Sequence, residues 1–276
     1  MQNATFELNA GGVLQLLCIA RQAGDAVMAV YTAMRKDGAD EVLLGHKEDA
    51  SPLTQADMAS HEVIVRGLRA LSPSTPIVSE EDTAPPVLCA RAGEFWLIDP
   101  LDGTKEFLSQ SDEFTVNIAL ARDGKAVFGV VLAPAMGLLY WGGPGLGAFR
   151  EIDGQRTSIC VAALPAAGQA CRVVASKSHI NSQTLEFIAK LGAHSLVTAG
   201  SSLKICKVAD GAADVYPRLG LTSEWDTAAA HAIVEAAGGC VSGLDGGPLT
   251  YGKSDILNPH FVVSSTPFAM LLARDD

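Results

Sequence analysis

Acidic side chains gather around one short segment of the sequence. An apolar run over residues 95–98 ends at Asp99, and Asp102 follows three residues later. Two carboxylates on one tight turn repel each other unless a divalent cation lies between them. Gly103 and Thr104 begin a predicted helix, whose first backbone amides suit a phosphate group. This pattern fits the cation and phosphate that phosphoryl transfer needs, although turn and cap roles for Asp99 and Asp102 stay open.

Three further acids occupy comparable places. Glu80 follows a short predicted strand, and Asp57 and Asp226 lie where predicted helices begin. Each has an ordinary alternative: a solvated loop acid for Glu80, a capping box with Thr54 for Asp57, and an N-cap for Asp226. Several acids at strand ends and helix starts indicate a shared cation site. Their spacing alone does not prove that they converge.

The composition describes a folded protein with an acidic surface. The 276 residues include 20 Lys and Arg against 31 Asp and Glu, a formal net charge of −11, and 48% of them are hydrophobic. This balance excludes intrinsic disorder and disfavours a nucleic-acid polymer as partner, because such binding uses clustered cations. A small anionic substrate stays compatible, since a bound cation reverses the local sign. The six cysteines form no CxxC pair, which argues against a zinc site.

We expect no secretory signal and no transmembrane segment. The first basic residue is Arg21, so the basic region of a signal peptide is missing. The uncharged stretch 126–149 is long enough to span a membrane, but Pro134 and several glycines interrupt it, and buried strands explain it better. These features predict a cytoplasmic protein, and they are compatible with peripheral association with the inner membrane.

Hydrophobic periodicity predicts a mixed α and β chain. Helices are expected over 11–35 and 55–71, and short strands over 76–79 and 95–98. An antiparallel meander is expected over 114–121, 126–133, 138–142 and 146–150. Beyond residue 154, strand-like segments (172–176, 195–199, 213–216, 240–242, 260–264) alternate with helix-like ones (181–191, 201–210, 226–237, 267–274). That alternation implies an α/β layer, with a soft boundary near 155–170.

Four segments, in this order, resemble the inositol monophosphatase superfamily of Mg²⁺-dependent, lithium-sensitive phosphatases. They are Lys47 to Asp57, Glu80-Glu81, Asp99-Pro100-Leu101-Asp102-Gly103-Thr104 and Trp225-Asp226-Thr227-Ala228-Ala229. Each is weak alone, but the combination is highly specific. The resemblance implies an α+β or α/β fold, the layered αβαβα sandwich of the sugar phosphatases. Its two subdomains would be 1–160, with the antiparallel sheet and the metal-site loops, and 161–276, with Asp226 and substrate-phosphate contacts.

Within the superfamily, the chain is most similar to the bacterial 3′(2′),5′-bisphosphate nucleotidases. Four segments carry this likeness: Asp-Gly-Thr-Lys-Glu-Phe (102–107), Phe-Thr-Val-Asn-Ile-Ala-Leu (114–120), Gly-Ser-Ser-Leu-Lys (200–204) and Tyr-Pro-Arg-Leu-Gly-Leu-Thr (216–222). The resemblance implies hydrolysis of adenosine 3′,5′-bisphosphate to AMP and phosphate, with the sulfated analogue as a further substrate and a place in sulfur metabolism.

The resemblance also implies a role for each site residue. Two to three Mg²⁺ ions would be held by Glu80, Asp99, the backbone carbonyl of Leu101, Asp102 and Asp226. Thr104, polarised by Asp57, would orient the attacking water. The implied substrate contacts are Lys47, Glu80, Leu101, Asp102, Gly103, Thr104, Ser202, Lys204, Arg218 and Asp226. Among these, Ser202, Lys204 and Arg218 would hold the second phosphate, and Ser176 to His179 would line the nucleoside side.

Other functions stay open at this point. The same chemistry would serve an inositol monophosphatase or a sugar bisphosphatase. A metal-dependent nucleotide-binding regulator without turnover is a second class, which Asp57 and Thr104 disfavour because a binder needs no oriented water. An RNA-binding protein is disfavoured by the acidic balance. The expected assembly is a monomer or a homodimer acting on a small nucleotide bisphosphate.

Overall fold

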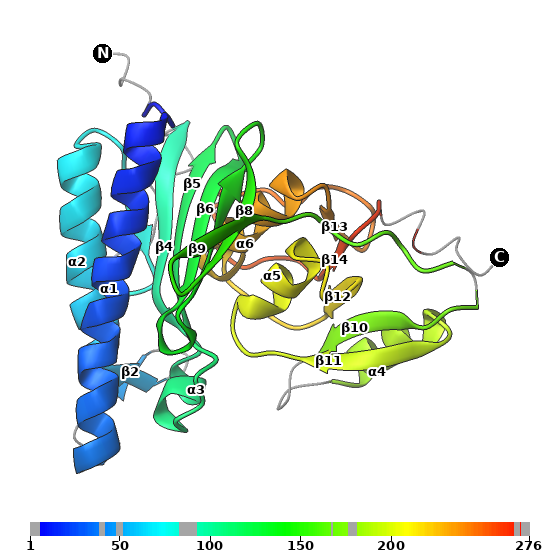
Figure 1. Ribbon diagram of the computed structural model, residues 1–276, viewed down its shortest axis with the longest axis horizontal. Helices are drawn as coiled ribbons and strands as arrows, with labels where there is room; N and C mark the ends of the chain where they lie inside the picture. The colour runs from blue at the N-terminus through cyan, green and yellow to red at the C-terminus, as the bar shows by residue number, and fades with distance from the viewer. Residues whose placement is uncertain are drawn as a thin grey trace.

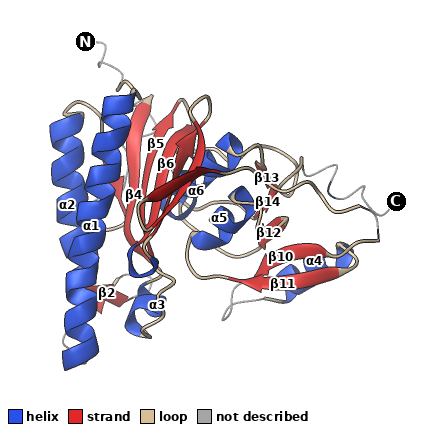
Figure 2. Ribbon diagram, in the orientation of Figure 1, coloured by secondary structure: helices blue, strands red, loops and turns tan. Residues whose placement is uncertain are grey.

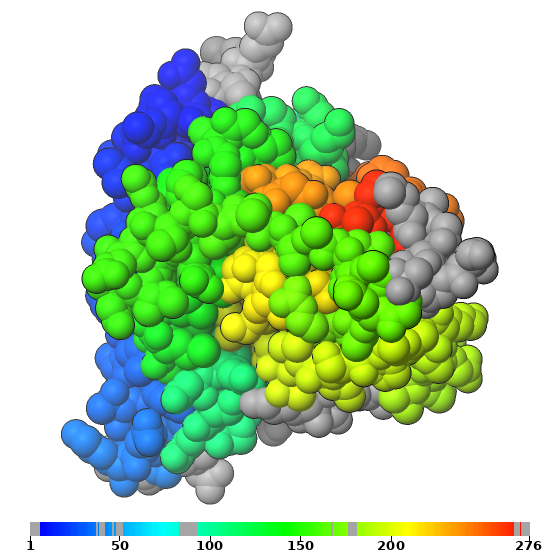
Figure 3. Space-filling model, turned by 45° about the vertical axis from the view of Figure 1, so that its right-hand side comes forward, coloured from blue at the N-terminus to red at the C-terminus, as the bar shows by residue number. Residues whose placement is uncertain are grey.

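The chain folds into five layers, described by a computed structural model over residues 6–38, 42–47, 52–82, 93–166, 168–175, 181–267 and 271. Two helices cover a seven-stranded sheet, two further helices separate it from a five-stranded sheet, and one helix covers the far face (Figures 1 and 2). This is the predicted αβαβα sandwich. On the surface the same order runs from the blue helices through the green strands to the yellow second half (Figure 3).

The outer helices are α1 (Ala10–Asp37) and α2 (Gln55–Leu71), which lie side by side (Figure 1). The side chain of Asn9 accepts a hydrogen bond from Gly12 N at the start of α1, and Thr54 caps α2. Apolar residues at helical spacing on α1 pack against the first sheet: Leu16, Ala20, Ala23, Val27, Tyr31 and Met34. Both predicted helices are confirmed.

By length and composition, α1 could also cross a membrane, over Ala10–Lys36. Sequence analysis had weighed only 126–149 as a span, and that segment forms strands of the first sheet, as predicted. Core helices of soluble proteins pass the same test, and α1 buries one face against α2 and the sheet. This packing supports the core-helix interpretation, and the expectation of no transmembrane segment stays a prediction.

The first sheet follows the chain order. Its strands are β3 (Ile77–Ser79), β4 (Glu94–Asp102), β5 (Thr115–Arg122), β6 (Lys125–Ala133), β7 (Leu138–Gly143), β8 (Gly147–Ile152) and β9 (Gln155–Ser158). Only the β3–β4 pair is parallel among these described strands. The 3₁₀ turn η2 (Pro134–Met136) joins β6 to β7, helix α3 (Thr104–Leu108) follows β4, and β1 (Leu43–His46) pairs separately with β2 (Pro52–Thr54).

The predicted meander is confirmed, with one addition. Sequence analysis placed a boundary over 155–170, but β9 occupies its first four residues and pairs with β8. All four β9 residues are exposed and polar, so no alternation of apolar side chains could predict this strand.

The second half carries the predicted alternation of strands and helices. The sheet order is β11 (His194–Thr198), β10 (Cys171–Ala175), β12 (Val215–Arg218), β14 (Phe261–Ser264), β13 (Cys240–Gly243), parallel across the first three and antiparallel across the last three. Helix α4 (Ser182–Lys190) packs on its outer face. Helices α5 (Leu203–Ala209) and α6 (Glu224–Ala236) lie between the sheets. The predicted helix 267–274 falls mostly outside the described residues.

Helix α6 can lie between the sheets because its inward residues are small. Ala228, Ala229, Ala230 and Ala232 are all buried, in an apolar cluster that includes residues of both sheets. On β6, Gly129 lies directly beneath this helix, where an added Cβ would be 1.9 Å from the carbonyl oxygen of Ala229. Glycine is required there for the close approach. The division into subdomains at 160/161 stays a prediction.

We expect Gly129→Ala to lower the free energy of unfolding by about 3 kcal/mol, because the clash is between backbone and Cβ and no side chain can rotate away. The matched control is Gly11→Ala on the exposed face of α1, where an added Cβ makes only ordinary contacts. Urea denaturation of both variants measures the difference. Equal stability of the two variants would refute the close packing of α6.

Candidate active site

The end of β4 places two carboxylates at the edge of the first sheet. Residues 95–101 are buried, and the pairing of β4 with β5 shifts register between Asp99 and Asp102, across Pro100. Asp99 is 1% exposed, and one of its oxygens accepts a hydrogen bond from the backbone N of Leu101 at 3.1 Å. The irregularity lets both acids leave the regular alternation of the strand. The predicted strand 95–98 therefore extends to Asp102.

Asp102 is tied to the second half of the chain. Its Oδ2 accepts a hydrogen bond from the backbone N of Ser202 at 2.6 Å and faces the Asn117 amide at 3.5 Å. The Ser202 hydroxyl is buried and engaged with Asn117 Oδ1 at 2.8 Å and with Thr115 Oγ1 at 2.9 Å. Ser202 therefore holds the start of α5 against β5 and Asp102. Its predicted contact with substrate remains a prediction.

Asp226 comes to the same place from the start of α6. It occupies the third position of the helix in a capping box, where its Oδ2 accepts from Ser223 N at 2.8 Å. Burial raises the pKa of Asp226 to about 8, with Asp102 and Glu80 adding to the rise. Burial also raises the pKa of Asp102 to about 6. For Asp99, burial raises the pKa strongly, with Glu80, Asp102 and Asp226 contributing.

These mutual effects mean that Glu80, Asp99, Asp102 and Asp226 lie within electrostatic range of one another, although 146 residues separate the first from the last. In the part of the chain that the structure describes, no three His, Cys, Asp or Glu side chains stand close enough to hold an ion in their present rotamers. The four acids lie near one another, and several of their oxygens accept hydrogen bonds from protein donors. The convergence that spacing could not prove is present, and the assigned metal roles remain predictions.

Glu80 and Lys47 form a charged group beside these acids. The Lys47 ammonium donates to Glu80 at 2.8 Å and to Glu81 at 2.6 Å. Burial would lower the pKa of Lys47, but the two carboxylates outweigh burial and the pKa rises. Burial raises the pKa of Glu81 to about 7. Lys47 is thus a neutralising partner of the acids here, and its predicted substrate contact is not tested.

Asp57 sits at the third position of α2, as predicted from the capping box. Its Oδ2 accepts from Thr54 N at 2.7 Å and from Thr54 Oγ1 at 2.6 Å. Its Oδ1 is buried and has no hydrogen-bond partner among the described residues, and burial raises the pKa of Asp57. The Thr104 hydroxyl instead donates to Leu101 O at 3.3 Å, although α3 packs against β2 beside Asp57. The Asp57–Thr104 pairing stays a prediction.

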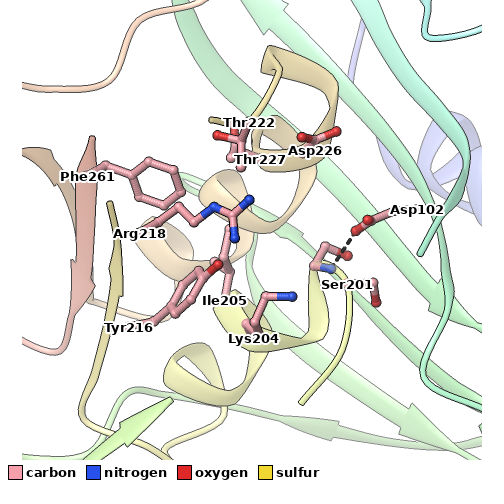
Figure 4. A pocket seen from close by; sticks show the side chains of 11 residues that line it. Asp102, Ser201, Lys204, Ile205, Tyr216, Arg218, Thr222, Asp226, Thr227 and Phe261 are labelled. Atoms are coloured by element: carbon pink, nitrogen blue, oxygen red, sulfur yellow. Dashed lines mark hydrogen bonds between the residues drawn. The ribbon is translucent and has the colours of Figure 1, made fainter. Parts of the chain in front are cut away.

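A cavity of about 80 Å³ lies between two acids, Asp102 and Asp226, and two cations, Lys204 and Arg218 (Figure 4). The ends of Lys204 and Arg218 point into it from α5 and β12. Burial lowers the pKa of Lys204, and Asp102 opposes that shift. Arg218 donates to Leu221 O at 2.8 Å, while its Nε is buried and has no hydrogen-bond partner within the described ranges. The lining residues are Asp102, Ser201, Ser202, Lys204, Ile205, Tyr216, Arg218, Thr222, Asp226, Thr227 and Phe261.

Several of these lining residues had no role predicted from the sequence. Ser201 is 7% exposed, its hydroxyl has no hydrogen-bond partner in the part of the chain that the structure describes, and its backbone is left-handed with φ at 42°. A strained residue with an unpaired hydroxyl in a pocket is a candidate ligand contact. The Gly-Ser-Ser run offered a signal for it. Phe261 offered none, because a buried strand residue is indistinguishable in sequence from core. The predicted nucleoside contacts at Ser176 to His179 lie outside the described residues.

The model of the inositol monophosphatase family matches residues 14–273. The chain is 47% identical over 257 residues to the 3′(2′),5′-bisphosphate nucleotidase CysQ of Salmonella typhimurium, covering 91% of this chain and 99% of the relative. It is 46% identical over 252 residues to the CysQ of Escherichia coli K12, with 91% and 98% covered.

Among solved structures, CysQ from Bacteroides thetaiotaomicron, a bacterial member of the inositol monophosphatase family, matches with a TM-score of 0.81 at 36% identity. The match covers 95% of this chain and 100% of that one. The family model and these relatives extend over nearly the whole length of this chain. The protein belongs to the inositol monophosphatase family.

Proposed function

We propose that this protein is a Mg²⁺-dependent 3′(2′),5′-bisphosphate nucleotidase that hydrolyses adenosine 3′,5′-bisphosphate to AMP and phosphate, and also acts on the sulfated analogue. The observation that carries the proposal is one cavity with acids on one side, Asp102 and Asp226, and two cations on the other, Lys204 and Arg218. A substrate with two phosphates matches both sides. The CysQ relatives, which are named for this activity, support the same substrate.

The acids fit Mg²⁺ by their chemistry. Hard oxygen donors of Glu80, Asp99, Asp102 and Asp226, with the Leu101 carbonyl, suit Mg²⁺ rather than zinc. The buried, unpartnered oxygen of Asp57 and the raised pKa values of Asp99, Asp102 and Asp226 indicate a place where negative charge needs compensation. Binding would require modest rotations, because several of these oxygens now accept other hydrogen bonds. Two to three ions are part of the proposal.

When bound, the ions would supply charge neutralisation for the transferred phosphoryl group and activate the attacking water. The protein itself would contribute by positioning the attacking water and the substrate. Thr104, whose hydroxyl now donates to Leu101, would orient the water with the help of Asp57. The amides at Gly103 and Thr104 would receive the scissile phosphate. No side chain needs to form a covalent intermediate.

The cations would distinguish a bisphosphate from a monophosphate. Arg218 can bind a phosphate with two parallel hydrogen bonds, and Lys204 adds a point charge. Ser201, with its unpartnered hydroxyl on the same cavity, is a further donor in this proposal. An inositol monophosphate would leave this cationic half without an anionic partner.

Location and assembly belong to the same proposal. The net charge of −11 gives little attraction to anionic lipid headgroups, which supports a cytoplasmic enzyme over one associated peripherally with the inner membrane. The proposed assembly is a monomer or a homodimer.

The direct test is phosphate release from adenosine 3′,5′-bisphosphate, inositol 1-phosphate and fructose 1,6-bisphosphate, each with and without Mg²⁺ and with Li⁺ added. We expect the highest kcat/KM on adenosine 3′,5′-bisphosphate, no turnover without Mg²⁺, and inhibition by Li⁺. A higher kcat/KM on either other substrate would replace the proposed one. No turnover of any substrate would favour a binding protein.

Arg218→Ala should weaken the bisphosphate selectively. Loss of a charged hydrogen-bonded pair costs about 2 kcal/mol, which lowers kcat/KM for adenosine 3′,5′-bisphosphate about 30-fold. The value for adenosine 3′-monophosphate should change little. Arg218→Lys tests the guanidinium geometry, and Arg21→Ala, in an exposed ion pair with Glu151, is the surface control. Equal losses on both nucleotides would remove Arg218 from this role.

Mg²⁺ should stabilise the protein more at higher pH. In the metal-free protein the folded-state pKa values of Asp102 and Asp226, about 6 and about 8, lie above the ordinary value of 3.8, so the folded state binds more protons than the unfolded one. Its free energy of unfolding therefore falls as pH rises from about 4 to about 8. Bound cations remove this repulsion, and their stabilisation follows mass action.

Thermal unfolding in chelator and in millimolar Mg²⁺ measures this effect at two pH values within that range, about 6 and about 8. The rise in Tm should be larger at about pH 8 than at about pH 6, where protons already neutralise part of the charge. Asp226→Asn should lose most of the rise. A rise of the same size at both pH values would contradict the electrostatic account.

A further inference from the structure

A buried carboxylate that the proposed reaction does not use lies two residues before Asp226. Glu224 is 2% exposed, and both of its oxygens are engaged. Oε2 accepts from the backbone N of Gly252 at 2.6 Å, and Oε1 accepts from the backbone N of Lys253 at 3.1 Å and from the Lys253 ammonium. The backbone N of Glu224 donates to Ile256 O at 2.9 Å. The segment 250–258 is therefore fastened to the first turn of α6.

Asn258 fastens the same segment to the residues on either side of Glu224. It is 4% exposed, and its side-chain amide donates to Ser223 O at 2.8 Å and to Thr227 Oγ1 at 3.0 Å. Its backbone N donates to Thr222 O at 2.8 Å. Thr222 and Thr227 both line the cavity. Asn258 thus fixes the cavity wall around the start of α6.

Ser223 connects these hydrogen bonds to Asp226. Ser223 N donates to Asp226 Oδ2, while Ser223 O accepts from Asn258. Glu224 is covalently next to Ser223 and is anchored by three donors. A shift of the first turn of α6 would therefore change which way the Asp226 carboxylate faces.

We propose that Glu224 is a positioning residue that, together with Lys253 and Asn258, sets the orientation of the Asp226 carboxylate for Mg²⁺. This inference rests on the proposed metal role of Asp226. Groups that orient metal ligands without touching the metal commonly change metal affinity by tenfold or more. The hydrogen bonds of Glu224 and Asn258 to residues 222–227 and 252–253, here called the clamp, act on the side of the cavity that carries Asp226. Lys204 and Arg218, on the substrate side, lie on α5 and β12, and among the described residues no hydrogen bond joins either of them directly to Glu224, Lys253 or Asn258.

The main variant is Glu224→Gln. Glutamine keeps the size of the side chain but has only one acceptor oxygen, so it cannot satisfy donors on both sides as Glu224 does. We expect the Kd for Mg²⁺, measured by calorimetry on the full chain, to rise about tenfold. Turnover should fall at limiting Mg²⁺ and recover at saturating Mg²⁺. KM for the bisphosphate at saturating Mg²⁺ should stay unchanged.

The matched control is Asp214→Asn. Asp214 is also buried, and accepts from the backbone N and guanidinium of Arg172, but it directly precedes β12, at the opposite end of that strand from Arg218. This variant should lose stability without a change in Mg²⁺ affinity. Lys253→Met is the second test variant, because it removes one donor of the clamp and leaves the two backbone amides. Its Kd should lie between those of wild type and Glu224→Gln.

An unchanged Mg²⁺ affinity in folded Glu224→Gln would overturn the proposal, and so would an equal loss in Asp214→Asn. If Glu224→Gln does not fold, an unchanged Kd in Lys253→Met overturns it. Wild type that binds Mg²⁺ but does not hydrolyse the bisphosphate would refute the substrate assignment, while calorimetry would still decide the role of Glu224. Wild type that binds no Mg²⁺ would refute both.

Discussion

The repulsion among carboxylates collected below the surface is the constraint on which this structure depends. Asp99 is almost fully buried, and the charges of Asp102, on the same strand, and of Asp226, at the start of α6, act on it. Buried ions of like charge are costly unless each finds donors or a cation. The fold supplies donors one by one, from the amides of Leu101, Ser202 and Ser223. Those bonds leave net negative charge at one point of the molecule, which is where a divalent cation stabilises most.

The scaffold explains how acids from distant parts of the sequence share that point. Asp57 and Asp226 both occupy the third position of a helix and both close a capping box through Oδ2. The positive end of the helix macrodipole favours a carboxylate there. The cap therefore holds one oxygen in place and leaves the other for a different partner. For Asp57 and Asp226 a capping role is therefore compatible with the proposed role in the active site, because the cap occupies only one of the two oxygens.

Local sequence rules predicted most of the fold because the relevant signals are local. Thr54 and Asp57 mark the start of α2, and the turn at Asp123-Gly124, where both residues have positive φ, separates β5 from β6 as predicted. Strand β9 was not predicted because all four of its residues are exposed, so no alternation of buried and exposed side chains marks the strand in the sequence. The Gly-Ser-Ser run drew attention to Ser201, but its left-handed backbone, with φ at 42°, could not be predicted, because residues other than glycine rarely adopt that conformation.

The same division applies to the site. The acids could be nominated from sequence because a charged residue at the end of a buried strand or the start of a helix conflicts with ordinary packing, and the conflict is visible locally. Their convergence could not, because it depends on α6 passing between the sheets over Gly129. The bond from Ser202 to Asp102 then joins the acidic side of the cavity to the helix that carries Lys204. Under the proposed function, substitutions at Lys204 or Arg218 would change the recognised anion and leave the carboxylates in place, because the cations and the acids lie on different elements.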